Sequence, residues 1–219
     1  MVEVSTSLLS IEKEKSIKTI YDLEASGTNY FHIDVMDGIF VKNNTIDLMR
    51  EYTEYIKQVA NTPIEVHLMV KDVESYAKAY IDMGVNSITF HIEALKNEKE
   101  VLKLISYIKQ NDVKVGVTLR PETPIEEIYP YIPYIHSVLI MSVEPGEGGQ
   151  EFIKESLDKI SKLNVFAYEN GYDIDIAVDG GINDKTAKQV IEAGANILVA
   201  GSYITNSKNY KEAIDSVKK

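Results

Sequence analysis

The sequence predicts an α/β protein that forms one (β/α)8 TIM barrel spanning residues 1–219 as a single domain. Short β-branched and apolar runs alternate with longer amphipathic stretches along the whole chain, and eight such pairs can be counted. Segments 137–143 and 197–202 are almost continuously apolar, which is typical of parallel strands covered on both faces. An open doubly wound sheet is the other architecture with this alternation, but eight units in 219 residues favour the closed barrel.

The apolar runs define the expected strands, and the spacing between them defines the helices. Ile17, Ile20 and Leu23 lie at helical spacing and predict a helix over 11–25. Glycines at 84 and 194 are expected to end helices over 73–83 and 185–193. The expected strands are 2–9, 30–36, 64–70, 87–92, 114–119, 137–143, 175–179 and 197–202.

The composition narrows the class of function. The chain has 23 Lys and Arg against 34 Asp and Glu, a net charge of −11, which argues against nucleic-acid or membrane partners. It contains no cysteine, so any metal must be held by His and carboxylate side chains. We find no targeting segment and no apolar run long enough to span a membrane, and we therefore expect a cytoplasmic protein.

Polar residues gather at the expected carboxyl ends of the strands, where barrel enzymes place their chemistry. His32 and Asp34 are two residues apart, so their side chains share one face of a strand. His67 has the corresponding position in the next strand, and Asp179 ends the seventh. Two imidazoles and two carboxylates suit a divalent transition metal. A hydrogen-bonded polar cluster that stabilises the barrel mouth is an equal alternative from spacing alone.

Three glycine-containing segments follow the last strands. They are 141–150, the pair Gly180 and Gly181, and Gly201 followed by Ser202. Glycine allows backbone N–H groups to turn toward an anion, and barrels commonly bind phosphate at their last loops. A tight strand-to-helix turn is the better explanation of any one segment, but three segments in succession favour a phosphate site.

Taken together, these motifs resemble the ribulose-phosphate 3-epimerase family over nearly the whole chain. The segments that carry the resemblance are Ser7-Leu-Leu-Ser10, His32-Ile-Asp-Val-Met-Asp-Gly38, Val66-His-Leu-Met69, Val143-Glu-Pro-Gly-Glu-Gly-Gly-Gln150, Val178-Asp-Gly-Gly181 and Val199-Ala-Gly-Ser202.

The resemblance implies a metal-dependent isomerase that interconverts D-ribulose 5-phosphate and D-xylulose 5-phosphate. Inversion at C3 would proceed through a cis-enediolate, with Asp34 removing the proton and Asp179 returning one to the opposite face. His32 and His67 would complete the ligands of one divalent ion per subunit, which could be Zn, Fe, Mn or Co. The implied partners are a phosphorylated ketose and further copies of this chain in a homo-oligomer.

The resemblance also assigns the residues that would contact the substrate. The methionines would exclude water from the reacting atoms, and the glycines would hold phosphate and sugar. We expect His91 to be an ordinary barrel histidine, with a position beside the metal ligands as the alternative, His136 to have no catalytic role and Asp37 to stabilise a turn. The expected substrate contacts are Ser7, Met36, His67, Met69, Met141, Gly146, Glu147, Gly148, Gly149, Gly180, Gly181, Gly201 and Ser202.

Four residues depart from the family pattern, namely Lys42, Arg120, Glu147 and Tyr203. Glu147 stands in the glycine-rich segment, so we expect it to face solvent or to pair with a cation such as Lys42. These departures leave a second substrate open, a ketohexose 6-phosphate such as D-allulose 6-phosphate. A non-catalytic phosphosugar-binding barrel is a third alternative, which four retained buried polar side chains argue against.

Overall fold

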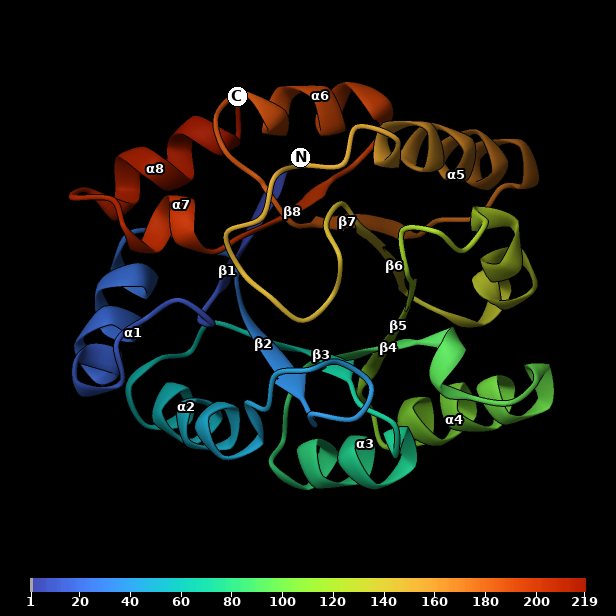
Figure 1. Ribbon diagram of the computed structural model, residues 1–219, viewed down its shortest axis with the longest axis horizontal. Helices are drawn as coiled ribbons and strands as arrows, with labels where there is room; N and C mark the ends of the chain where they lie inside the picture. Colours follow the sequence, from blue (N-terminus) through green and yellow to red (C-terminus); the bar gives the residue numbers. More distant parts are fainter. Residues whose placement is uncertain (1) are drawn as a thin grey trace.

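The structure, a computed structural model, describes residues 2–219 and confirms the predicted barrel. Parallel strands pair in sequence order, and β8 pairs with β1 to close the ring (Figure 1). The strands are β1 (Glu3–Ser7), β2 (Tyr30–Met36), β3 (Ile64–Met69), β4 (Ser87–His91), β5 (Lys114–Leu119), β6 (Ser137–Met141), β7 (Asp175–Asp179) and β8 (Ile197–Ala200).

Helices surround the strands, and the predicted helices are present, although α1 begins at Ser16 and not at residue 11, after a 3-10 helix over Lys13–Lys15. The Asn183 side chain accepts hydrogen bonds from the backbone of Lys185 and Thr186, and Gly194 ends the helix with a φ of 118°. The helices are α1 (Ser16–Ala25), α2 (Ile46–Val59), α3 (Val73–Asp82), α4 (Glu98–Gln110), α5 (Ser156–Asn170), α6 (Thr186–Ala193), α7 (Ser202–Thr205) and α8 (Tyr210–Val217).

Some boundaries differ from the prediction for identifiable reasons. The connection from β5 to β6 is a 3-10 helix, Ile125–Tyr134, which contains Pro130 and Pro133 and therefore lacks two of the N–H donors of an α-helix. The expected strands at β1, β6 and β8 continue two or more residues past the observed strands, and those at β3 and β4 continue one residue past. Leu8 and Val143 follow the last residues of β1 and β6 and are still buried. The apolar run in the sequence is therefore longer than the strand.

Successive side chains along β2 point alternately toward the surrounding helices and toward the barrel interior. Phe31 and Ile33 face outward into the core shared with the helices, whereas His32 and Asp34 face the barrel interior. The interior is apolar on the side of β6, β7 and β8, where Leu139, Ala177 and Val199 pack together. His32 and Asp34 face this apolar side from across the barrel, and Asp179 at the end of β7 is the acidic side chain on the apolar side.

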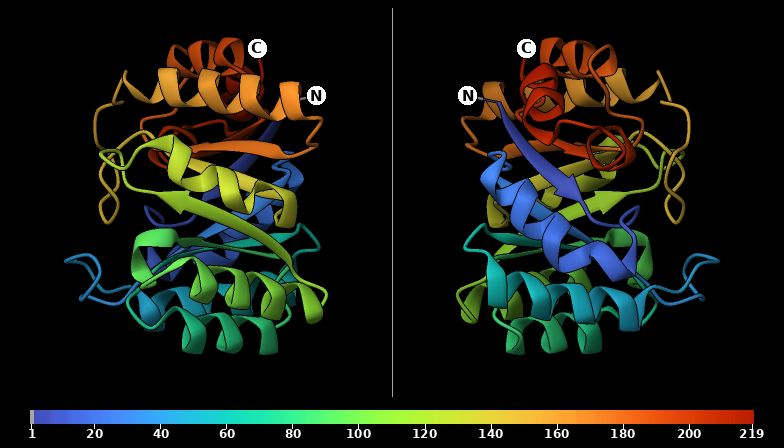
Figure 2. Two further views of the ribbon diagram at one scale, coloured as in Figure 1. Left: turned by 90° about the vertical axis from the view of Figure 1, so that its right-hand side faces the viewer. Right: turned by 90° about the vertical axis from the view of Figure 1, so that its left-hand side faces the viewer.

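The loops after β2 and β6 project from the same end of the barrel (Figure 2). Asn43 in the first loop donates a hydrogen bond to the Gly146 carbonyl in the second, at 2.8 Å. No helix within residues 2–219 has the length and apolar character needed to cross a membrane. The cytoplasmic location and the homo-oligomer stay predictions.

Candidate metal centre and active site

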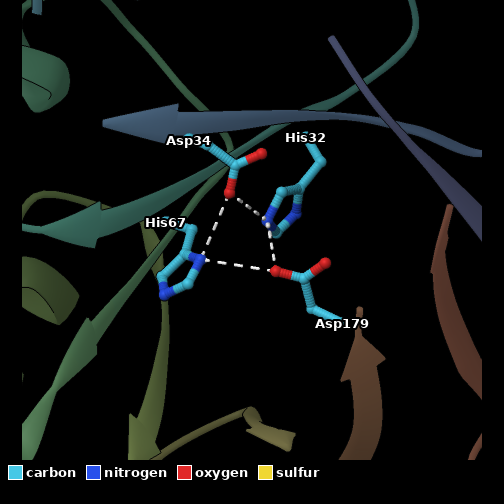
Figure 3. Close-up of side chains that lie close together, drawn as sticks. All are labelled: His32, Asp34, His67 and Asp179. Atoms are coloured by element: carbon cyan, nitrogen blue, oxygen red, sulfur yellow. Dashed lines mark ion pairs between the residues drawn. The ribbon is translucent and has the colours of Figure 1, made fainter. Parts of the chain in front are cut away.

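Four side chains from three strands converge at the carboxyl end of the barrel interior (Figure 3). The register pairs Asp34 of β2 with His67 of β3, and Asp179 ends β7 across the barrel. Asp34 Oδ1 lies 3.4 Å from His32 Nε2 and 3.3 Å from His67 Nδ1. Asp179 Oδ2 lies 3.9 Å from His32 Nε2 and 3.7 Å from His67 Nδ1. The four ligand atoms all lie within 4.8 Å of one another.

This donor set fits a divalent transition metal. His32 Nε2 and His67 Nδ1 are buried and have no hydrogen-bond partner within residues 2–219. A buried nitrogen without a partner costs free energy, and both nitrogens face the same two carboxylates. Two imidazole nitrogens and two carboxylate oxygens are ligands that such ions accept together. The arrangement can therefore hold a metal ion. A polar cluster with a solely structural role would instead satisfy these nitrogens with hydrogen bonds.

A second layer of polar side chains supports the first. Ser7 Oγ donates a 2.7 Å hydrogen bond to Asp34 Oδ2, which leaves Oδ1 for the imidazoles. Beneath the site, Glu65 Oε2 lies 3.7 Å from His32 Nδ1 and accepts a 2.6 Å hydrogen bond from Ser5. Ligand-supporting partners of this kind orient imidazoles at metal sites. Sequence reasoning missed Glu65, although it lies two residues before His67 on the same strand face.

His91 differs from the ordinary barrel histidine that we expected. Its Nε2 lies 3.0 Å from His67 Nε2, so the side chain contacts a candidate metal ligand directly. His136 lies at the other end of the barrel, where its Nδ1 accepts a hydrogen bond from the Val115 backbone. Asp37 accepts backbone hydrogen bonds from Ile39 and Lys71, as expected of a residue that stabilises a turn.

Burial and mutual charge shift the pKa values of the four groups in opposite directions. Burial lowers the pKa of His32, but the carboxylates of Asp34, Glu65 and Asp179 outweigh burial and hold this pKa well above 6.5. Burial, together with the negative charge of Asp34, raises the pKa of Asp179 to about 7. Burial lowers the pKa of His67 to about 4. Without a metal, the cluster therefore carries exchangeable protons near neutral pH on His32 and Asp179.

A cavity of about 490 Å³ opens above the cluster and has Asp34 and Asp179 in its wall. The two histidines lie beneath the carboxylates, and His67 is fully buried, so the predicted contact of His67 with a substrate stays a prediction. The other predicted substrate contacts also line this cavity, namely Ser7, Met36, Met69, Met141, Gly146, Glu147, Gly148, Gly149, Gly180, Gly181, Gly201 and Ser202. The sequence analysis missed further lining residues, including Gln150, Asn183 and Thr186.

Backbone at the β7 end of the cavity requires glycine. Gly180 has a φ of 120°, and a Cβ there would lie 2.5 Å from the Val143 side chain. Gly181 has a φ of 63°, and a Cβ there would lie 2.9 Å from the Phe152 backbone. Because larger residues are excluded, the main chain itself forms the wall at this point, which suits an anion held by N–H groups.

Comparisons with known proteins agree with this architecture. The family model described as the ribulose-phosphate 3 epimerase family matches residues 3–205. The ribulose-phosphate 3-epimerase of Bacillus subtilis (strain 168) is 40% identical over 219 residues, covering 100% of this chain and 99% of its own. That of Methanocaldococcus jannaschii is 38% identical and covers 100% of this chain and 90% of its own. The chain belongs to the ribulose-phosphate 3-epimerase family.

Membership of the epimerase family makes the chain an isomerase, and it sets aside the alternative of a non-catalytic barrel. A chloroplastic ribulose-5-phosphate-3-epimerase of Arabidopsis thaliana is 39% identical and covers 98% of this chain and 75% of its own. A solved 3-hexulose-6-phosphate synthase superposes with a TM-score of 0.72 at 14% identity, covering 99% of this chain and 98% of its own. That likeness shows the shared barrel fold alone.

The four departures from the epimerase family pattern lie around the rim of the site. Glu147 and Lys42 are exposed, and no ion pair joins them in the part of the chain that the structure describes. The Tyr203 hydroxyl lies 3.0 Å from Ser216 Oγ and is directed toward α8. Arg120 lies with its guanidinium 4.5 Å from the centre of the Phe40 ring and donates to the Phe40 carbonyl.

Proton competition predicts that divalent metal binds more tightly as the pH rises. The raised pKa values of His32 and Asp179 mean that a metal must displace protons from both groups below about pH 7. The dissociation constant for Mn²⁺ should therefore fall by between about tenfold and about 100-fold from pH 6 to pH 7, because each of the two displaced protons contributes up to a factor of ten. Calorimetric titration in two buffers of different ionisation enthalpy counts the protons released.

The exposed His136 offers a matched control, because His136→Asn removes an imidazole far from the cluster and should leave this slope unchanged. A Mn²⁺ affinity that stays constant between pH 6 and 8 would contradict the assignment.

Proposed function

We propose that this epimerase interconverts D-ribulose 5-phosphate and D-xylulose 5-phosphate by inverting the configuration at C3. The observation that carries the proposal is that Asp34 and Asp179 both lie in the wall of one cavity, where the pKa of Asp34 is lowered and that of Asp179 is raised. The full-length relatives that carry the name ribulose-phosphate 3-epimerase support the choice of a pentulose phosphate. One group that accepts a proton and one that supplies a proton are what an inversion requires.

The proposal includes one divalent metal held by His32, Asp34, His67 and Asp179. When bound, such an ion acts as a Lewis acid that lowers the cost of negative charge on neighbouring substrate oxygens. The partnerless nitrogens of His32 and His67 support this assignment. The resemblance allows Zn, Fe, Mn or Co, and the donor set of nitrogen and oxygen atoms is compatible with each.

Asp34 is the base in the direction that starts from ribulose 5-phosphate. Burial alone would raise its pKa, but His32 outweighs burial and keeps the carboxylate ionised, ready to accept a proton. Ser7 Oγ fixes the carboxylate by donating to Oδ2. A base must stand within reach of the proton it removes, and Asp34 presents its carboxylate to the cavity.

Asp179 is the acid that returns a proton to the other face of C3. Its pKa of about 7 allows it to hold a proton at neutral pH and to release it when negative charge develops on the substrate. The two aspartates exchange roles in the reverse direction. The resulting cis-enediolate would lie between them, against Met36, Met69 and Met141, whose side chains exclude water.

The phosphate would lie at the far side of the cavity, on main-chain N–H groups. Gly180 and Gly181 bring backbone close to the cavity, and Ser202 begins α7 beside Gly201. This arrangement explains how a chain with a net charge of −11 can bind an anionic substrate, because the positive field is local. Glu147 lines the cavity but is exposed, so solvent screens its negative charge and reduces its repulsion of phosphate.

The two-base mechanism predicts severe losses from isosteric substitutions. Asp34→Asn and Asp179→Asn each remove one proton-transfer group, and each should lower kcat by about 10²- to 10⁴-fold. A coupled assay that follows the conversion of ribulose 5-phosphate to xylulose 5-phosphate gives kcat for each variant. The metal content of each variant is measured in parallel.

Asp184→Asn is the matched control, because Asp184 is an exposed aspartate in the loop that follows β7. It should retain wild-type turnover. Near-wild-type activity in both Asp34→Asn and Asp179→Asn would rule out the two-base mechanism.

If the site prefers a pentulose phosphate, kcat/KM should differ between a pentulose phosphate and a hexulose phosphate. We expect kcat/KM for D-ribulose 5-phosphate to exceed that for D-allulose 6-phosphate by at least about tenfold, which is the discrimination that a pocket shaped for one fewer carbon supplies. Both substrates are assayed with the same metal-loaded protein. An equal or larger kcat/KM for the hexulose phosphate would transfer the assignment to that substrate and leave the proton chemistry unchanged.

A further inference from the structure

His67 and His91 form a buried imidazole pair. His67 Nε2 and His91 Nε2 are 3.0 Å apart, and both side chains are fully buried. Two nitrogens at this distance share one hydrogen atom, because two N–H groups would repel each other and two lone pairs would form no bond. The hydrogen therefore belongs to one ring, and its position decides which nitrogens of both rings carry lone pairs.

The other nitrogen of each ring has a fixed neighbour. His67 Nδ1 faces Asp34 and Asp179, at 3.3 Å and 3.7 Å, which is the position of the candidate metal. His91 Nδ1 faces Glu93 Oε2 at 3.6 Å, and neither of these two atoms has a hydrogen-bond partner within residues 2–219. One end of the pair therefore meets the metal site and the other end meets a carboxylate.

We propose that His91 and Glu93 are positioning residues that set the tautomer of His67 for metal binding. The Glu93 carboxylate attracts the hydrogen of His91 to Nδ1, so His91 Nε2 accepts the hydrogen from His67 Nε2. His67 Nδ1 is then left with a free lone pair aimed at the metal position. The inference rests on the metal centre under the proposed function, but the tautomer of His67 exists with or without the ion.

Hydrogen bonds to one carboxylate oxygen of Glu93 fix the side chain and leave its other oxygen facing His91. Its Oε1 accepts hydrogen bonds from the Arg120 backbone at 2.7 Å and from Thr123 Oγ at 2.6 Å. The loop that supplies these donors is itself fixed by Lys159 of α5, which donates to the carbonyls of Arg120, Pro121 and Thr123. Oε2 is left toward His91.

Aromatic packing restrains the His91 ring. The Phe40 ring lies 5.0 Å from it, and the Arg120 guanidinium covers Phe40 from outside. The centre of the His67 ring lies 5.1 Å from the centre of the His91 ring. The two imidazoles therefore have little freedom to rotate away from the Glu93 carboxylate. Through Phe40, the loop after β2 also helps to position His67 on β3.

Glu93→Gln tests the proposal because it exchanges a charged acceptor for an amide of the same shape. The Arg120 N–H cannot move, so the new amide keeps its oxygen toward Arg120 and presents its NH₂ group to His91 Nδ1. The hydrogens of the imidazole pair can move, and they shift to His91 Nε2 and His67 Nδ1. The Nδ1 lone pair of His67 is then lost from the metal position.

Two measurements on the full chain give the result. Nitrogen-15 chemical shifts of the imidazoles in metal-free protein should show hydrogen on Nε2 of His67 in the wild type and on Nδ1 in Glu93→Gln. The dissociation constant for Zn²⁺, measured by chelator competition, should rise about 10- to 100-fold in Glu93→Gln, the usual effect of losing a partner that orients a ligand. Glu122→Gln removes an exposed carboxylate from the same loop and should change neither value.

The outcomes separate this inference from the metal centre itself. A wild-type tautomer with hydrogen on His67 Nδ1, or the same tautomer in the wild type and in Glu93→Gln, overturns the inference. A wild-type protein that binds no Zn²⁺ contradicts the proposed metal centre, and the shifts of its metal-free form still decide the tautomer. If Glu93→Gln does not fold, the wild-type shifts alone decide between hydrogen on Nε2, which supports the inference, and hydrogen on Nδ1, which overturns it.

Discussion

The site depends on one constraint, the burial of two imidazoles and two carboxylates inside a barrel that is otherwise filled by apolar side chains. His67 is fully buried and Asp34 is 4% exposed, so neither can rely on water to stabilise its polar atoms. Each must find protein partners or an ion. Ser7 bonds to Asp34, Glu65 lies beside His32 and His91 bonds to His67, so the supporting residues serve all three ligands on β2 and β3.

The same constraint explains why the barrel interior is divided. Apart from Asp179, the polar residues of the site lie on β1 to β4, and the other side packs Leu139, Ala177 and Val199 as an apolar wall. Asp179 is the exception on that wall, and burial together with the negative charge of nearby Asp34 raises its pKa. The fold thus gives two aspartates different environments, and the difference in environment makes one carboxylate suited to accept a proton and the other suited to supply one.

Sequence reasoning predicted the barrel and the clustering of His32, Asp34 and His67 because both depend largely on local periodicity. The spacing of His32 and Asp34 places them on one strand face whatever the rest of the chain does. His91 and Glu65 could not be placed in the same way, because contacts between strands depend on register and on side-chain rotamers. The register pairs His67 with Thr89, and the His91 ring reaches His67 diagonally. The signal available was the His-x-Glu pattern of His91 and Glu93 at the end of a strand.

The central claim is that two different side chains exchange protons with opposite faces of C3. Wild-type protein incubated with D-ribulose 5-phosphate in heavy water tests it most directly, with deuterium at C3 of the product followed by NMR from the earliest turnover. The account predicts that every xylulose 5-phosphate molecule carries one solvent-derived deuterium at C3, because the acid that returns the proton is not the base that removed it. Product that retains the substrate's own C3 hydrogen would contradict the account.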